Sequence, residues 1–245
     1  SLKKVFKKFK NIKVYISKEN KGYGASINFA VKKIKTKYFI AANPDITGIN
    51  KKSIGCFTKY ANILKDNFSV IGPHFKNASN KGHYQTNLKY KIRKIHNVHG
   101  SLMFFNKEIF LKNKGFDKNF FMYWEETDYT KRANSNGYNA YQLNLVKVKH
   151  DKGKSVESNS LIAKKNIEIF YSWHFIWSKY YFYYKHYGRV LSVLYFIPII
   201  CRLFIRVNLN KNNKNHLKYT YRWDGLINSI LLNKSSLRLS HLTYK

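Results

Sequence analysis

The chain has 245 residues, of which 44% are hydrophobic, so it can build a folded core, and its composition is not that of a disordered tail. Lysine and arginine outnumber the acidic residues 46 to 12. The resulting net charge of +34 attracts polyanions such as nucleic acid, anionic lipid head groups or sugar nucleotides. The two cysteines, Cys56 and Cys201, lie far apart without a CxxC pair, which argues against a disulfide framework or a cysteine zinc site and fits a reducing compartment.

The first 150 residues alternate between predicted strands and helices. A buried strand is expected at 12–16, and a glycine turn leads into a helix at 25–36 with apolar residues at helical spacing. Further strands are predicted at 37–42, 68–71, 100–105 and 138–149, further helices at 50–66, 106–113 and 125–135, and a loop at 74–98. This alternation predicts an α/β fold with a mostly parallel sheet flanked by helices.

From about residue 158 the composition becomes aromatic, basic and helical, so we expect a sheet domain over 1–157 and a helical appendage over 158–245. Helices are predicted at 160–187 and 219–233. Between them, the apolar run 190–207 is slightly short of a membrane span. Its aromatic and cationic flanks favour a helix lying in a membrane interface, and the alternative is a buried hairpin helix that closes the domain.

Three of the twelve acidic residues, Glu125, Glu126 and Asp128, fall within four positions. Like charges so close together repel and raise one another's pKa, so a metal, a cation or a need for a general base should offset the cost. Part of the cluster has a structural explanation, because Asp128 is spaced to pair with Arg132 and acids in a first helical turn favour the helix dipole.

Weaker candidates lie elsewhere. Asp45 follows the carboxyl end of an apolar strand, where open α/β sheets bind ligands, although Asn-Pro-Asp is also an ordinary turn. Gly22 and Gly24 precede a helix N-terminus, which can hold phosphate oxygens. His150 ends a predicted strand, and a lone histidine there is either structural or a metal ligand.

The order of these segments resembles family 2 glycosyltransferases of the rhamnosyltransferase-like branch. The resemblance rests on residues 20–28 (NKGYGASIN), Asn43-Pro44-Asp45, and above all the block from Gly100 to Tyr138, which contains Gly115-Phe116-Asp117 and the run FFMYWEETD at 120–128. His150 with Ser155, and the stretch 180–188, resemble later landmarks of the same family.

The resemblance implies a GT-A-type (Rossmann-like) fold and an inverting transfer of a sugar, possibly rhamnose-like, from a nucleoside-diphosphate donor. Glu126 matches the general-base position that would deprotonate the acceptor hydroxyl. The acceptor would be held by Trp124, Glu125 and Asp128. Asp45 and His150 match positions that bind a divalent metal, Mg²⁺ or Mn²⁺. Donor-binding positions map to Asn20, Gly22, Gly24, Asn28, Asn43 and Asp45.

Two positions depart from the family pattern: Asn43 stands where a strict DxD motif has an acid, and Glu126 stands where Asp is commoner. The resemblance also implies that the family's first strand–helix–strand unit, whose acidic residue reads the nucleotide base, precedes this sequence. It implies a lipid-linked or cell-surface glycan acceptor, and work at the cytoplasmic face of an anionic membrane. The main alternative, a basic nucleic-acid-binding protein, fits the charge, but the sequence shows no recognised nucleic-acid motif. A non-catalytic membrane scaffold is the third reading.

Overall fold

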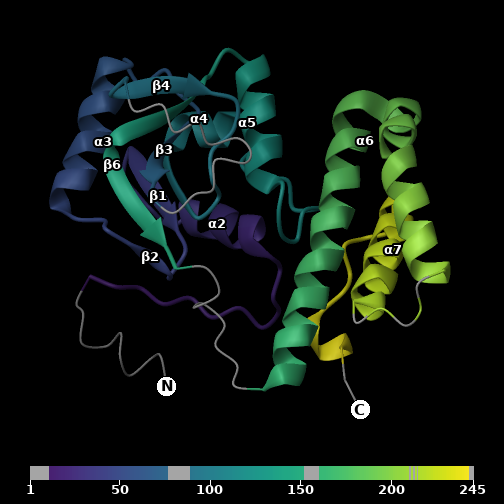
Figure 1. The fold of residues 1–245 in the computed structure, drawn as a ribbon. Coiled ribbons are helices and arrows are strands. Elements are labelled where there is room, and N and C mark those ends of the chain that lie inside the picture. The colour runs from purple at the N-terminus through teal and green to yellow at the C-terminus, as the bar shows by residue number, and fades with distance from the viewer. Residues whose placement is uncertain are drawn as a thin grey trace.

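The computed structural model describes residues 11–76, 89–151, 160–209, 211, 213 and 215–242. A sheet with helices on both faces holds the first part of the chain, and a bundle of long helices stands beside it (Figure 1). The mixed α/β architecture expected from the sequence is confirmed. The expected domain boundary at 157/158 and Ser155 lie outside the described residues.

The sheet has the strand order β1-β5-β3-β6-β2, and β4 also pairs with β6. Its strands are β1 (Tyr38–Ala42), β2 (Ile46–Thr47), β3 (Val70–Phe75), β4 (Ile92–Ile95), β5 (Leu102–Asn106) and β6 (Ala140–His150). Strand β5 is antiparallel to both β1 and β3, whereas β3 and β6 are parallel. Therefore β1, β3 and β6 run in one direction, and β5 opposes them from a place between β1 and β3.

The expectation of a mostly parallel sheet is wrong for the strands that the structure describes. Of their five pairings only β3–β6 is parallel. Alternation along the sequence does not fix strand direction here, because a long connection separates β3 from β5 and lets the chain return antiparallel. Part of that connection forms β4, which the sequence predicted as loop.

Two hydrophobic clusters cover the two faces of the sheet. Neighbouring β5 residues show the division: Phe104 enters one cluster with Phe57 of α3 (Lys51–Ile63), and Phe105 enters the other. The second cluster lies under α2 (Tyr23–Val31), α4 (Lys107–Lys112) and α5 (Glu125–Ser135). Side chains alternate between the two faces of a strand, so one short apolar strand serves both cores.

Residues 12–16 do not form the predicted strand. The structure gives this segment no regular secondary structure, and Ile12, Val14, Tyr15 and Ile16 are all at least 43% exposed. An apolar run becomes a strand only when a neighbouring strand takes up its backbone hydrogen bonds. No described strand pairs with this segment.

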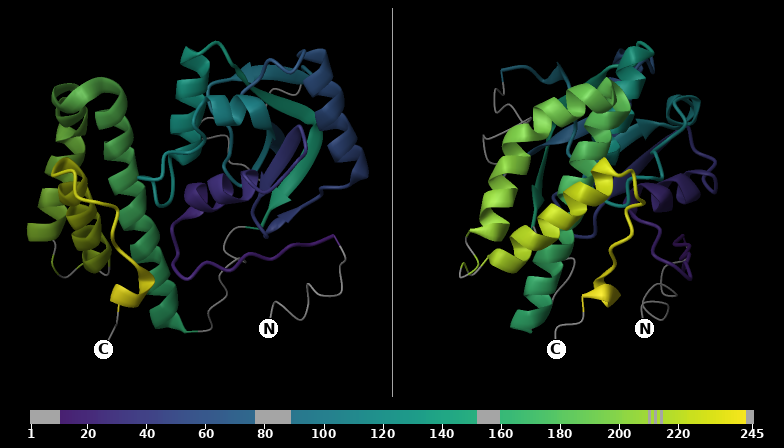
Figure 2. Two further views of the ribbon diagram at one scale, coloured as in Figure 1. Left: turned by 180° about the vertical axis from the view of Figure 1, so that it is seen from behind. Right: turned by 90° about the vertical axis from the view of Figure 1, so that its right-hand side faces the viewer.

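The C-terminal part is a helical hairpin with one further helix. Helix α6 (Leu161–Asn208) reverses at Gly188, whose φ of +79° breaks the helical path, and α7 (His216–Ile230) packs beside it (Figures 1 and 2). Phe196 and Leu203 on the returning half are buried against Tyr180 and α7. A short 3-10 turn, Leu239–His241, lies near the C-terminus.

Candidate functional site

The candidate residues gather at one edge of the sheet. Because β1, β3 and β6 run in the same direction, their carboxyl ends share an edge, and β5 begins at that edge. Asp45 follows β1, His150 ends β6 and Gly100 precedes β5. Backbone hydrogen bonds join the segments: the Asn43 amide donates to the Ser101 carbonyl over 2.8 Å. This is the edge where open α/β sheets bind ligands.

Asp45 and His150, which the family resemblance matches to metal-binding positions, lie next to each other at this edge. The Asp45 Oδ1 lies 3.1 Å from the His150 Nε2, and both side chains are largely buried. The pair is set by β2, since Ile46 stands opposite His150 in an antiparallel pairing. Among the described residues no group of three or more His, Cys, Asp or Glu could hold a metal ion. A carboxylate and an imidazole suit a divalent cation whose other ligands come from substrate and water.

Helix α5 carries the acidic cluster into this edge on an unusual turn. Tyr123 and Trp124, directly before the helix, both adopt the left-handed conformation, with φ of +68° and +69°. This conformation costs a non-glycine residue on the order of 1 kcal/mol, so it persists only where the surroundings enforce it. The turn places Glu125 and Glu126 at the first two helical positions, with Glu125 beside Gly24 of α2 and Glu126 beside Gly100.

Glu126 lies beside the start of β5. Its carboxylate carbon is 3.4 Å from where a Cβ on Gly100 would stand, so any larger residue at position 100 would crowd it. Burial raises the pKa of Glu126 to about 7. A carboxylate with such a pKa exchanges protons near neutral pH, as a general base must.

Glu125 is more deeply buried, with 4% of its surface exposed. Its Oε2 has no hydrogen-bond partner among the described residues. Burial first, and the neighbouring Glu126 second, raise the pKa of Glu125 well above its ordinary value. Burial thus favours the protonated carboxyl, the form that can donate a hydrogen bond.

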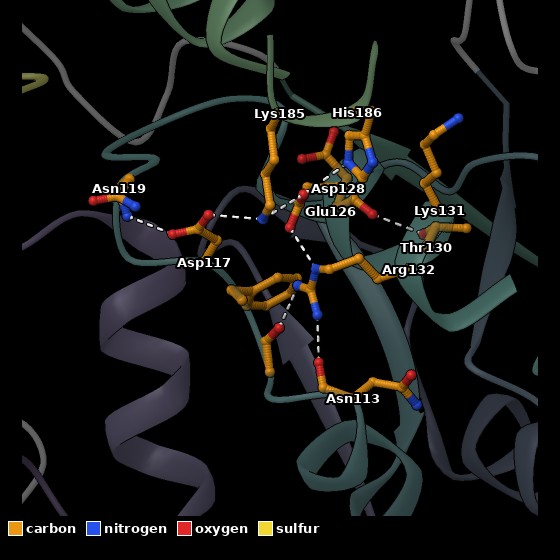
Figure 3. Close-up of polar contacts among 12 residues, drawn as sticks. Asn113, Asp117, Asn119, Glu126, Asp128, Thr130, Lys131, Arg132, Lys185 and His186 are labelled. Carbon is orange, nitrogen blue, oxygen red and sulfur yellow. Dashed lines mark hydrogen bonds and ion pairs between the residues drawn. The ribbon is translucent and has the colours of Figure 1, made fainter. Parts of the chain in front are cut away.

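Asp128, the third acid, is fully buried and surrounded by basic side chains (Figure 3). Its carboxylate lies 2.8 Å from the Arg132 Nε, 2.7 Å from the Lys185 Nζ and 2.9 Å from the His186 Nε2. Burial would raise the pKa of Asp128, but His186, Arg132 and Lys185 together lower it to about 2. This arrangement supports the ion-pair interpretation of Asp128. It leaves the proposed contact with an acceptor without support.

The predicted donor-binding residues are mostly engaged in packing. A Cβ on Gly22 would lie 2.2 Å from the Phe121 carbonyl oxygen, and one on Gly24 would lie 2.9 Å from the Phe116 Cβ, so both glycines permit close approach. Both polar atoms of the Asn28 side chain bond the backbone of Phe116, at 2.7 and 3.0 Å. Asn20 is exposed, and its Oδ1 accepts from the Gly22 amide. Their roles toward a donor stay predictions.

Three residues of the site were not singled out from the sequence. The His99 ring contacts the His150 ring at 5.3 Å between centroids, while the next residue, Gly100, adjoins Glu126. The Tyr23 hydroxyl donates to the Gly100 carbonyl over 2.6 Å. Tyr171 of α6 is close enough to Asp45 for the carboxylate to help raise its pKa, after burial. No local pattern marks them, because each reaches the site from a distant segment.

Trp124 lies against α6, not in open solvent. Its ring packs on Phe182 at 5.1 Å, on Tyr183 at 6.2 Å and on Phe175 at 6.3 Å between centroids. The ring stays partly exposed. Trp124 and the aromatic residues of α6 therefore form a wall beside the start of α5, where Glu125 and Glu126 lie. Partly exposed aromatic faces of this kind can stack on a sugar ring.

Comparison with known proteins gives a result at the level of the fold. No protein-family model and no curated protein matches the sequence. Among solved structures, the mannosyltransferase PcManGT from Pyrobaculum calidifontis, in complex with GDP-Man and Mn²⁺, aligns with a TM-score of 0.53 at 11% identity, covering 95% of this chain and 72% of that one. S. aureus TarS 1–349 aligns with a TM-score of 0.48 at 12% identity, covering 94% and 76%. The match to PcManGT shows that the chain has the fold of a glycosyltransferase.

Proposed function

We propose that this protein is an inverting glycosyltransferase that uses a nucleoside-diphosphate sugar. The observation that carries the proposal is that Glu126 and the Asp45–His150 pair lie against two neighbouring residues, Gly100 and His99, at the carboxyl-end edge of a sheet with a glycosyltransferase fold. His99 contacts His150, one of the two proposed metal ligands. The next residue, Gly100, contacts Glu126, the proposed base. We also propose a rhamnose-like donor and a lipid-linked or cell-surface glycan acceptor, and these two proposals rest on the sequence resemblance alone.

Sugar transfer needs a base that takes the proton from the acceptor hydroxyl. On the other side of the sugar it needs a group that stabilises the negative charge on the departing diphosphate. An acceptor hydroxyl oxygen attacks the anomeric carbon, and its proton passes to the Glu126 carboxylate. The bond from that carbon to the diphosphate oxygen breaks, and its electron pair leaves with the diphosphate. Partial exposure leaves Glu126 open to an acceptor, and its raised pKa lets it keep the proton.

Asp45 and His150 would hold a divalent cation, which when bound neutralises charge on the departing diphosphate. The PcManGT structure contains Mn²⁺ with its nucleotide sugar, which supports the same class of ion here. Glu125, through its buried carboxyl, and Trp124, through its partly exposed ring, would hold the acceptor sugar.

The function is tested by screening nucleotide sugars for release of nucleoside diphosphate with and without Mn²⁺ or Mg²⁺. We expect Glu126→Gln to abolish turnover while donor binding stays near wild type, because the amide keeps the shape but cannot take a proton. We expect Asp45→Ala to lose metal-dependent donor binding. A Glu126→Gln protein with wild-type turnover would contradict the base assignment, and salt-sensitive nucleic-acid binding without any donor response would favour the nucleic-acid alternative.

The acceptor would be met at a membrane surface. Helix α6 contains a window long and apolar enough to cross a membrane, and 17% of that window is buried. Phe196 and Leu203 face the helical bundle, so one face of the returning half is occupied. Its other face exposes large apolar side chains: Val190, Leu191, Leu194, Ile197, Phe204 and Ile205. We assign this face to the head-group boundary of an anionic bilayer, because copies of a chain with net charge +34 repel one another.

A further inference from the structure

One face of α6 contacts each of Met122, Tyr123 and Trp124, the residues directly before α5. Ser178 donates a hydrogen bond over 2.8 Å to the carbonyl of Met122, which comes just before the two left-handed residues. Phe175 packs on the Tyr123 ring at 5.7 Å, and Phe182 packs on Trp124 at 5.1 Å.

The same face then reaches α5. The Lys185 Nζ lies 2.7 Å from Asp128 and also 2.7 Å from Asp117, and the His186 Nε2 lies 2.9 Å from Asp128. Figure 3 shows Lys185 between the two aspartates, with Arg132 below them. The Arg132 guanidinium donates hydrogen bonds to the carbonyls of Asn113 and Gly115. Lys185 and His186 thus join α6 to α5, and Lys185 also joins α6 to the loop before α5.

These contacts form a single stripe. We name it the α6 brace, and its members recur at helical spacing of three and four: Tyr171, Phe175, Ser178, Phe182, Lys185 and His186. Together they contact residues 117, 122–124 and 128 of the segment 117–128. Because so many residues of the α6 brace contact this one short segment, the brace can hold the backbone of the segment in place.

Holding is needed because the turn is strained. Two consecutive non-glycine residues in the left-handed conformation would relax unless their surroundings fixed them. The Asp128 amide closes the first helical turn by donating to the Trp124 carbonyl over 2.8 Å, so motion at Trp124 is passed to α5. Glu126 lies between those two residues.

We propose that the α6 brace positions the Glu126 carboxylate, with Lys185 and His186 as positioning residues that act through Asp128. The inference rests on the proposed function, since it concerns the base of that reaction. It makes the C-terminal helices a part of the candidate site, in addition to any role at a membrane.

The test compares Lys185→Met with Lys165→Met, which removes an exposed lysine from the same helix. We expect Lys185→Met to lower kcat between about tenfold and a hundredfold at nearly unchanged donor KM, because misplacing a catalytic group by about 1 Å has effects of that size. Lys185→Arg should recover part of the rate, and Lys165→Met should match wild type. If Lys185→Met does not fold, His186→Ala and His186→Gln are compared instead. We expect His186→Ala to lower kcat and His186→Gln to retain more of it, because the Gln amide can donate a hydrogen bond to Asp128 as His186 does.

Amide hydrogen exchange over residues 122–128 gives a readout independent of sugar transfer. Faster exchange there in Lys185→Met and His186→Ala, but not in Lys165→Met, would support the brace. It would do so even if the protein turned over no donor, because absence of turnover contradicts only the proposed function. Wild-type kcat together with wild-type exchange in both variants would overturn the inference. A loss in kcat matched by an equal rise in donor KM would also overturn it.

Discussion

At the scale of single residues, three acids within four positions have three different environments. Glu126 is partly exposed beside Gly100, Glu125 is buried without a described partner for its Oε2, and Asp128 is neutralised by cations. Burial without a partner raises a carboxyl pKa, and cationic neighbours lower it. The differences in pKa therefore arise from depth and partners, since the residue types are nearly the same.

The pH dependence of the reaction follows from Glu126. Burial raises its pKa to about 7 from an ordinary value of 4.5, so the carboxyl is protonated and inactive as a base below that pH and ionised above it. We expect kcat/KM to rise as pH increases through about 7 and then level off. Measuring kcat/KM from pH 5 to 9 at a saturating concentration of the metal ion checks this. An increase centred near pH 4.5 would contradict it.

Two glycines with similar backbone strain give a matched test of packing at the site. Gly22 has φ of +91° and would place a Cβ 2.2 Å from a carbonyl oxygen, whereas Gly137 has φ of +84° with no atom within 4 Å. We expect Gly137→Ala to lower the free energy of unfolding by about 1 kcal/mol from strain, and Gly22→Ala to lower it by clearly more. Chemical denaturation measures both, and equal losses would show that the clash relaxes without cost.

At the scale of elements, His174 links α6 to the C-terminal segment. It is fully buried, its Nδ1 lies 2.9 Å from the Ser235 hydroxyl and its Nε2 lies 3.0 Å from the Leu237 carbonyl. Burial lowers its pKa from 6.5 to about 4. Above pH 6.5 the ring is neutral in the folded and unfolded states alike, and between 6.5 and 4 only the unfolded chain takes up the proton.

Stability should therefore fall as pH decreases from 6.5 to 4, by about 3 kcal/mol once both states are protonated. We expect the segment 233–242 to lose amide protection over this range before the sheet does. Hydrogen exchange at several pH values checks the order. A His174→Gln protein, which lacks the titrating ring, should show a weaker dependence, and an unchanged one would contradict the assignment to His174.

At the scale of the whole molecule, charge and apolar surface should act together at a membrane. We expect the protein to bind anionic vesicles and release them as salt rises, since screening weakens the attraction of a +34 chain. Val190→Ser, Leu191→Ser and Leu194→Ser combined should weaken binding more than tenfold, because each side chain that enters the boundary contributes on the order of 1 kcal/mol.

The matched control is Ile63→Ser, at a position of α3 that is 57% exposed. Vesicle flotation at low and high salt measures both proteins. Equal binding of the triple variant and the control would contradict the assignment of this face, and equal binding to neutral and anionic vesicles would contradict the role of charge.

The sequence alone predicted the local elements well. Helix α5 at 125–135 was predicted with the bounds it has, α4 and β1 within about a residue, and Gly137 follows the helix end as expected. The Asp128–Arg132 pair was offered as the structural explanation of one acid, and it forms. These features depend on side-chain periodicity, capping and contacts within four residues, all of which are written in a short stretch of chain.

Only the tertiary structure decided the rest. Whether 12–16 becomes a strand depends on a partner, and strand directions depend on how long connections return. The distinct environments of Glu125, Glu126 and Asp128 depend on distant segments being packed together: Gly100 adjoins Glu126 from 26 positions away in sequence, and Lys185 adjoins Asp128 from 57 positions away. Burial and charge partners over such separations are properties of the fold, so no local pattern could reveal them.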